Sequence, residues 1–201
     1  MTKTGSEQMA RPRVLDIEKA IDVATTLFWR NGYESTSVAD LTKAMGITPP
    51  SFYFAFNSKD GLFLRVLEHY LETRLSYAEE ALNEPTARGV AELMLYRMAD
   101  LYTDAAHPPG CLAVNCALAC ADDPGPIRGE LSKLREARRM RLCNRLHEAK
   151  AAGDLPPDAV PEELARFLMT VGWGMALDAQ SGAKREQLYG TVERALKAWP
   201  S

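Results

Sequence analysis

The sequence lacks the features that mark most enzymes. Its three histidines, at positions 69, 107 and 147, are far apart in the chain. The GxSxG, P-loop, GxGxxG and HExxH patterns are absent from it. These absences argue against catalysis, and we expect the chain not to be an enzyme, with no cofactor and no bound metal.

The sequence also lacks long hydrophobic runs and paired cysteines. No stretch approaches roughly 18 consecutive apolar residues, so we expect no membrane-spanning helix and no membrane partner. The first residues, MTKTGSEQMARPR, contain no apolar segment typical of a signal peptide, and we expect a cytoplasmic protein. The four cysteines form no CxxC pair, which favours free thiols over a disulfide framework.

An excess of positive charge is lacking too. The net charge is −3, which by itself predicts no nucleic-acid partner. Residues 1–60 hold seven basic and seven acidic side chains, and residues 61–201 hold 17 and 20. Any nucleic-acid binding must therefore depend on where the charges lie rather than on their number.

What the sequence does contain is a helical hydrophobic period almost throughout, without convincing two-residue alternation. Turn residues separate the periodic segments. We therefore predict an all-α fold of about nine helices, in which residues 59–82 form one continuous rod about 36 Å long. The predicted helices are 16–31, 38–45, 49–55, 59–82, 87–105, 111–121, 127–152, 161–181 and 184–198.

Two short helices meet at a tight corner near Gly46. Ser37 is a good N-cap for the first of them, and Gly46 is expected to end it. Thr48 can cap the second helix, whose first turn accommodates Pro49 and Pro50. This is the minimal helix-turn-helix, whose second helix enters the DNA major groove, although an ordinary helix pair has the same pattern.

Polar side chains flank this corner. Hydroxyl groups at Thr36, Ser37 and Thr48 lie at helix N-termini, where backbone amides favour a phosphate. Ser51, Tyr53 and Lys59 can supply further donors to a DNA backbone. Upstream, Arg11 and Arg13 form either a minor-groove arm or a solvated tail.

The spacing of the N-terminal residues resembles the TetR/AcrR repressors. The resemblance covers roughly residues 13–73 and is carried by Ala24-x-x-Leu-Phe28, Asn31-Gly32-Tyr33, Thr36-Ser37, Leu41, Ala44-Met-Gly46-Ile47 and Ser51-Phe-Tyr53-x-x-Phe56-x-Ser-Lys59-x-x-Leu62-Phe63. It implies that Thr36, Thr48, Tyr53 and Lys59 contact phosphates, and that positions 48–50 and 54 lie nearest the base edges.

This sequence departs from the usual pattern on the reading helix. Pro49, Pro50, Phe54 and Ala55 stand where polar or basic side chains are common, so base readout would depend on thymine methyl contacts and DNA shape. Phe52 and Phe56 are expected in the core, and Phe54 either there or on the DNA. The candidate DNA-binding residues are Arg13, Thr36, Ser37, Thr48, Pro49, Pro50, Ser51, Tyr53, Phe54 and Lys59.

The resemblance also implies the domain organisation and partners. We expect a flexible basic arm (1–12), a helix-turn-helix DNA-binding domain (13–73) and a ligand-binding and dimerisation domain (74–201). The chain would be a ligand-responsive regulator that binds double-stranded operator DNA as a homodimer and is released by a small-molecule inducer. Candidate pocket residues are Tyr96, Leu101, Tyr102, Cys111, Asn115, Trp173 and Met175.

Dimerisation has some support from the residues themselves. The run Val171–Leu177 mixes small and large apolar residues, which lets helices approach closely, although a helix buried within one chain has the same pattern. The candidate interface residues are Leu164, Leu168, Val171, Gly172, Met175, Leu188 and Val192.

Two further groups admit several interpretations. His107, Cys111, Cys116 and Cys120 fall within 14 residues, and the cysteines are small core residues, reactive thiols or metal ligands. The basic run Arg135, Arg138, Arg139, Arg141 and Arg145 is expected to be a solvated helix face paired with Glu130, Glu136 and Glu148.

Overall fold

The computed structural model describes residues 15–118 and 125–200, and the regular structure within these ranges consists of ten α-helices. The predicted all-α fold is confirmed. The helices are α1 (Ile17–Asn31), α2 (Val38–Met45), α3 (Pro49–Phe56), α4 (Lys59–Arg74), α5 (Tyr77–Leu82), α6 (Ala87–Thr103), α7 (Leu112–Leu118), α8 (Pro126–Ala151), α9 (Pro161–Gln180) and α10 (Arg185–Lys197). The predicted arm 1–12, Arg13 and Cys120 lie outside the described residues.

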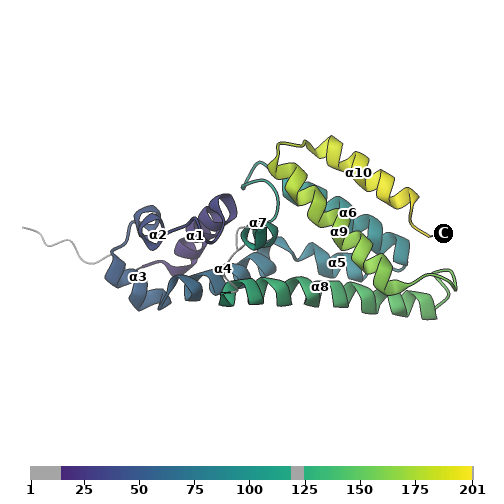
Figure 1. Ribbon diagram of the computed structural model, residues 1–201, viewed down its shortest axis with the longest axis horizontal. Helices are drawn as coiled ribbons and strands as arrows, with labels where there is room; N and C mark the ends of the chain where they lie inside the picture. Colours follow the sequence, from purple (N-terminus) through teal and green to yellow (C-terminus); the bar gives the residue numbers. More distant parts are fainter. Residues whose placement is uncertain (1–14, 119–124, 201) are drawn as a thin grey trace, which may run out of the picture.

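The molecule is elongated, with a small head and a larger body (Figure 1). Helices α1, α2 and α3 form the head at one end. Helix α4 runs from the head toward the body, where α5, α6, α8, α9 and α10 pack together, and α7 lies between α1 and the body. The head and the body are therefore linked both through α4 and through α7.

Aromatic packing holds the head together. The apolar stripe of α1 buries Ala24 and Phe28 completely, and Phe28 meets Phe63 of α4 edge to face with ring centroids 5.1 Å apart. Tyr33, which follows α1, stacks on Phe28 at 5.8 Å. Such aromatic pairs contribute about 0.5–1.5 kcal/mol beyond their buried area. Helix α3, only 8 residues long, is too short to persist by its own propensity, and it is held in the head by its buried side chains Phe52 and Phe56.

The predicted rod over residues 59–82 was wrong, because the helix breaks at Leu75 and Ser76. Leu75 is the C-cap of α4, and α5 begins at Tyr77. Both Leu75 and Tyr77 are buried. Residues two apart point to nearly opposite sides of a continuous helix, so the break is what allows both side chains to enter the core. It also accounts for ten helices instead of nine.

Helix α9 lies at the centre of the body, where it packs on α6, α8 and α10. A close contact with α6 lies at Gly172. A Cβ atom at this position would lie 2.4 Å from the sulfur of Met98 on α6, so the Met98 side chain would have to move. Glycine at 172 therefore suits the packing of α9 on α6 within the chain.

The junction between head and body is built on Trp29 at the end of α1. The Trp29 indole stacks on His107 with ring centroids 4.3 Å apart and meets Tyr70 of α4 edge to face at 5.0 Å. The thiol of Cys116 on α7 donates to the Phe28 carbonyl oxygen at 3.5 Å. Helices α4 and α7 thus both contact α1 directly at this junction.

Across the described residues, none of the helices combines the length and the apolar character that crossing a membrane requires.

Candidate nucleic-acid interface and ligand cavity

Local hydrogen bonds define both ends of α2. The Ser37 hydroxyl oxygen accepts from the backbone N–H of Asp40 at 3.1 Å, and the Asp40 carboxylate accepts from the Ser37 N–H at 3.0 Å. Hydrogen bonds from the side chain and then the backbone of Ser37 lower the pKa of Asp40. At the other end, Gly46 adopts the left-handed conformation at φ 67°. The predicted corner of the helix-turn-helix is present.

The start of α3 is a polar, exposed edge. Thr48 is its N-cap, with Oγ1 accepting from the Ser51 N–H at 3.4 Å. The hydroxyl oxygens of Thr48 and Ser51 are 2.9 Å apart. Pro49 and Pro50 occupy the first turn and are exposed. This edge can therefore present two hydroxyl groups and two apolar rings to a partner.

Helix α3 has one buried and one exposed aromatic face. Phe52 and Phe56 are buried in the head, as predicted, whereas Tyr53 is 52% and Phe54 96% exposed. The alternative that Phe54 belongs to the core is therefore excluded. An almost fully exposed phenyl ring costs free energy in water, which favours a surface that is covered when a partner binds.

Lys59 lies beside this face, at the first position of α4. Its Nζ atom is 4.1 Å from the centroid of the Tyr33 ring, a distance typical of a cation–π contact. The Tyr33 hydroxyl donates to the Asp60 carboxylate. The Lys59 ammonium is thus held at the edge of the head near α3.

The structure corrects the expectation for Thr36. Its side chain is fully buried, and its hydroxyl donates to the Gly32 carbonyl oxygen at 2.7 Å. The hydroxyl closes the turn between α1 and α2, so we no longer count this side chain among the DNA contacts. Ser37, by contrast, is exposed at the start of α2.

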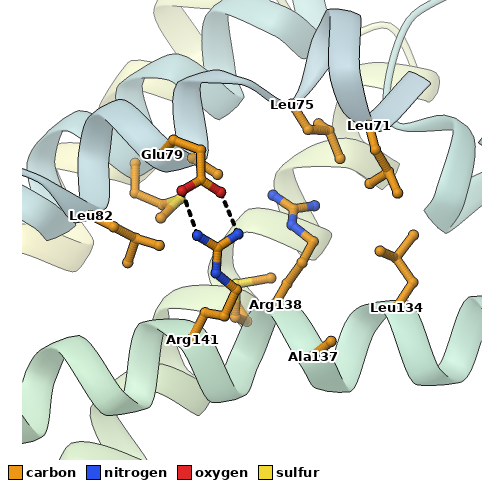
Figure 2. Close-up of a pocket in the computed structure, with 11 residues that line it drawn as sticks. Leu71, Leu75, Glu79, Leu82, Leu134, Ala137, Arg138 and Arg141 are labelled. Atoms are coloured by element: carbon orange, nitrogen blue, oxygen red, sulfur yellow. Dashed lines mark hydrogen bonds and ion pairs between the residues drawn. The ribbon is translucent and has the colours of Figure 1, made fainter. Parts of the chain in front are cut away.

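The body contains a cavity of about 230 Å³ between α4, α5, α6, α8 and α9. Its walls are mainly leucine, methionine and alanine side chains, with one acidic and two basic groups (Figure 2). The lining residues are Leu71, Leu75, Ala78, Glu79, Leu82, Met94, Leu134, Ala137, Arg138, Arg141 and Met169. An apolar cavity with a few polar groups is typical of a small-molecule site.

None of the seven candidate pocket residues lines this cavity. Tyr102 and Cys111 are buried next to it, where both interact electrostatically with Arg138. Tyr96 instead meets Tyr189 of α10 edge to face, at 4.9 Å. Leu101 and Asn115 each border a different surface crevice. Trp173 is partly buried with Arg135 near its ring, and Met175 is buried in α9.

Three arginines of α8 donate hydrogen bonds to the body, which corrects part of the expected solvated face, although the Arg141 side chain is still 55% exposed. Arg138 donates to the Tyr77 hydroxyl at 3.3 Å, and both terminal nitrogens of Arg141 donate to the Glu79 carboxylate (Figure 2). Arg145 donates to the carbonyl oxygens of Leu82 and Glu84. The sequence signal was the spacing of 138, 141 and 145, which places them on one side of a helix. The predicted partner Glu136 does pair with Arg139.

The candidate interface residues lie mostly inside the chain. Leu168, Gly172, Met175, Leu188 and Val192 are buried by α6 and by the packing of α9 on α10. Leu164 and Val171 are partly buried. The apolar side chains that α9 does expose include Phe167 and Leu177, at 37% and 39%. The apolar face of α9 and α10 that was selected from the sequence therefore packs within the body.

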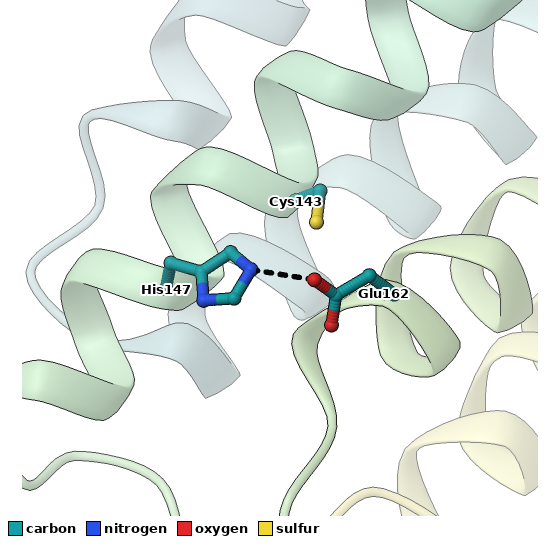
Figure 3. A group of neighbouring side chains, drawn as sticks. All are labelled: Cys143, His147 and Glu162. Atoms are coloured by element: carbon teal, nitrogen blue, oxygen red, sulfur yellow. Dashed lines mark hydrogen bonds and ion pairs between the residues drawn. The ribbon is translucent and has the colours of Figure 1, made fainter.

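The cysteines that the structure describes are buried, and none of them is in a disulfide. Cys111 and Cys116 are 2% and 0% exposed, so neither is the accessible thiolate that redox chemistry requires. A different cluster brings metal-ligating atoms together: Cys143 and His147 of α8 and Glu162 of α9, all within 4.8 Å of one another (Figure 3).

An exposed reading helix on a capped helix-turn-helix, joined to a helical body with a cavity, defines a DNA-binding regulator. Comparison with protein families agrees. Residues 20–66 match the family described as "Bacterial regulatory proteins, tetR family", and residues 92–197 match "Tetracyclin repressor-like, C-terminal domain".

Individual relatives extend over almost the whole chain. The HTH-type transcriptional repressor ComR of Escherichia coli (strain K12) is 32% identical, with 99% of this chain and 96% of ComR covered. BdcR of the same organism, also an HTH-type transcriptional repressor, is 30% identical over 98% of this chain and 96% of its own. The TetR family regulator CifR, solved with a 26-bp operator DNA, is 40% identical with a TM-score of 0.89, covering 94% of this chain and 100% of CifR.

The chain therefore belongs to the TetR family. It is a DNA-binding transcriptional regulator, and the expectation that it is not an enzyme is confirmed by this membership.

Proposed function

We propose that the protein is a repressor that binds operator DNA as a homodimer and is released by a small molecule bound in the body. The observation that carries the DNA-binding part is the two-faced α3, which buries Phe52 and Phe56 and presents Tyr53 and Phe54 to the outside. ComR and BdcR are described as repressors, and CifR was solved on operator DNA.

We assign different contacts to different parts of the reading surface. Thr48, Ser51, Tyr53 and Lys59 would donate to phosphates, together with Ser37 at the start of α2. Pro49, Pro50 and Phe54 would meet base edges, where their apolar rings fit thymine methyl groups. The described head offers few cationic groups to DNA, so the phosphate contacts would be made largely by hydroxyl groups and backbone amides.

We place the dimer interface on the outward face of α9 and α10. A groove between these helices is lined by Phe167, Val171, Gln187, Gly190, Thr191, Arg194, Ala195 and Ala198. Gly174 follows Phe167 and Val171 on the same side of α9, and a Cβ atom there would meet nothing within 4 Å. An open, partly apolar stripe that ends in a small residue suits close packing against a second copy.

Release would begin in the cavity between α4, α5 and α8. The cavity wall includes Leu71 of α4, and α4 carries Lys59 at its other end. A ligand that moved α4 would therefore shift the reading heads of the dimer relative to each other. Two heads must match half-sites about 34 Å apart, so a small displacement is enough to weaken binding.

The test is an electrophoretic mobility shift with DNA from upstream of the protein's own gene, together with footprinting. We expect a dimer-sized complex that protects two half-sites about one helical turn or a multiple of it apart. The variant that tests α3 is the double substitution Phe54→Ala with Tyr53→Ala, which removes the exposed aromatic face and leaves the buried face of α3 intact. If the double variant binds this DNA like the wild type, α3 is not the reading helix.

A further inference from the structure

Arg138 is a cation at the edge of the cavity without a carboxylate to balance it. Its guanidinium lies beside the Arg141–Glu79 pair and points toward Leu75 (Figure 2). Among the ion pairs of residues 15–118 and 125–200, none includes Arg138. Its hydrogen-bond partner is the hydroxyl of Tyr77.

The groups around Arg138 are neutral at physiological pH. Burial raises the pKa of Tyr77, and it raises the pKa of Tyr102 well above its ordinary value. Burial acts to lower the pKa of Arg138, but this pKa stays above its ordinary value, because Tyr77, Tyr102 and Cys111 would each attract the guanidinium if they ionised and the Tyr77 hydroxyl accepts its hydrogen bond, so Arg138 keeps its proton at physiological pH. A positive charge therefore faces the cavity, and among the described residues no carboxylate forms an ion pair with it.

The remaining charges of the cavity cancel. Arg141 is paired with Glu79, and the hydrogen bond from Arg141 lowers the pKa of Glu79, which keeps this carboxylate ionised. The lining thus carries a net charge of plus one, from Arg138. Partly buried charges are costly unless they are paired, so the complement of this cavity is a single negative charge on an otherwise apolar molecule.

The volume limits the size of that molecule. An engineered apolar cavity of about 150 Å³ holds benzene, and this cavity, at about 230 Å³, has room for a ring of that size with one additional group. A guanidinium edge binds a planar carboxylate with two parallel hydrogen bonds.

We propose that the cavity binds a small apolar monocarboxylate, aromatic or branched aliphatic, with its carboxylate on Arg138 and its apolar part against Leu71, Leu75 and Met169. The inference rests on the proposed release of DNA by a ligand in this cavity, but it concerns which chemical class binds there.

The experiment measures binding without DNA, by thermal shift and calorimetry on the full chain. The probes are benzoate, phenylacetate and 3-methylbutanoate, each paired with its neutral amide. We expect at least one carboxylate to raise the melting temperature and its amide not to. Arg138→Met should weaken carboxylate binding about 10- to 100-fold, the effect of losing a charged hydrogen-bond pair. Arg135→Met, one turn earlier on α8 and outside the cavity, should leave it unchanged.

Folding of the variant does not confuse the result. Replacing an unpaired, partly buried cation with methionine is expected to leave the ligand-free melting temperature equal or higher. Arg138→Gln provides a second, polar replacement with the same predicted loss. Amides that bind as tightly as carboxylates, carboxylate binding that survives in both variants, or no wild-type stabilisation by any carboxylate at millimolar concentration would each overturn the inference.

A second measurement, of operator affinity with and without the carboxylate, tests the proposed function separately. If a carboxylate binds through Arg138 and leaves operator affinity unchanged, the ligand class stands and the proposed release mechanism fails. If the operator is released only by neutral compounds, the proposed function stands and the ligand class fails.

A second observation, independent of the cavity, concerns the corner between α8 and α9. Cys143 and His147 are four residues apart on α8, and Glu162 lies in the first turn of α9. His147 Nε2 and the Glu162 carboxylate are 2.8 Å apart, and the Cys143 sulfur faces both (Figure 3). Thiolate, imidazole and carboxylate are the three kinds of ligand that proteins offer to zinc.

The arrangement is close to what one ion needs. Ligand atoms around tetrahedral zinc lie about 3.3–3.8 Å apart, from bond lengths of about 2.0–2.3 Å, and these three atoms lie within 4.8 Å. His147 and Glu162 have half-exposed side chains, so their ends can move by the remaining distance of about 1 Å. A water molecule would complete the four ligands.

We infer that Cys143, His147 and Glu162 form a site for a thiophilic divalent cation of the zinc class. The Cys143 thiol loses its proton to solvent as the metal–sulfur bond forms, while the imidazole binds in its neutral form. Binding would tie α8 to α9 near the start of α9.

Cobalt(II) tests this site, because a cobalt–thiolate bond gives a charge-transfer band in the near ultraviolet. We expect the metal-free wild type to take up one cobalt ion per chain with this band, and zinc to displace it. Cys143→Ser should abolish the band and His147→Ala should weaken binding, whereas Cys116→Ser should change neither. A band that persists in Cys143→Ser, or its absence in the wild type, would overturn the assignment.

Discussion

The side-chain amide of Asn115 on α7 donates a hydrogen bond to the backbone carbonyl oxygen of Trp29 on α1, at 2.9 Å. The Trp29 carbonyl belongs to the last turn of its helix, where no intrahelical N–H remains to satisfy it. A side chain of the body thus completes the end of a helix of the head.

Asn115→Ala is expected to lower the free energy of unfolding by about 1–3 kcal/mol, because a partly buried carbonyl loses its donor. Urea denaturation followed by circular dichroism measures the change. Asn144→Ala, at an exposed position of α8, is the matched control and should stay within about 0.5 kcal/mol of the wild type. Equal effects from the two variants would mean that the Asn115 hydrogen bond is not needed for stability.

Lys59→Ala should weaken binding to every DNA sequence alike, because the Lys59 ammonium is assigned to a phosphate. The slope of log affinity against log salt should fall by about one per monomer. Fluorescence anisotropy over a salt series on operator and random duplex measures it, with Lys133→Ala on α8 as the control. A change in sequence preference with an unchanged slope would contradict this assignment.

Phe54→Ala should change the preference among DNA sequences rather than the salt dependence of binding. Its exposed ring is assigned to base edges, so the variant should lose about 1–3 kcal/mol on the operator and little on random DNA. Competition binding on operators with single base-pair changes locates the contacted step. The control Leu64→Ala, which removes an exposed leucine from α4, should change neither the operator affinity nor the affinity for random DNA. If Phe54→Ala instead loses the same affinity on operator and on random duplex, the Phe54 ring contacts the DNA backbone and not the bases.

Two glycines of α9 are expected to affect different properties, one the stability of the protomer and the other the association of two protomers. Gly174→Leu should dissociate the dimer while leaving the helical content unchanged, because a side chain at 174 would meet nothing of its own protomer within 4 Å and would stand on the proposed interface. Gly172→Leu should instead destabilise each protomer, since its side chain would collide with Met98. Sizing near the wild-type dissociation constant and thermal melts distinguish the two. A fully dimeric Gly174→Leu protein would move the interface away from this face.

The cap at α2 predicts a pH dependence. Hydrogen bonds from Ser37 hold the pKa of Asp40 below its ordinary value of 3.8, so this carboxylate stabilises the fold above that pH, and the contribution is lost as the pH falls through the lowered pKa. Asp40→Asn should therefore be less stable than the wild type at about pH 7, and the difference in the free energy of unfolding should shrink toward about pH 3. A constant difference across this range would show that charge plays no part in the cap.

Sequence predicted the structure best where local hydrogen bonds decide it. The bounds of α2 were predicted to the residue, because Ser37 and Gly46 fix its ends through groups a few positions away. The head could also be recognised because the motif spacing is local. The break between α4 and α5 could not, since it depends on burying both Leu75 and Tyr77 against helices distant in sequence.

The body was harder to predict for a related reason. Periodicity shows that α9 has apolar faces, but it does not show which face another helix of the same chain covers. Gly172 and Gly174 look alike in sequence, yet the first contacts α6 and the second is open. The cavity likewise depends on Arg138, whose place beside Tyr77 requires α5 and α8 to be adjacent.

The shortness of α5 has a consequence for how tightly the cavity can hold any molecule. A helix of six residues does not persist by itself in water, so α5 depends on its packing against α6 and on the hydrogen bonds that Arg141 and Arg145 make with it. Its backbone amides should therefore exchange with deuterium through local opening faster than those of α9. A molecule in the cavity must hold α5 in place, and the entropy lost in doing so reduces its affinity. The affinity of a ligand and the slowing of amide exchange over residues 77–82 should rise together.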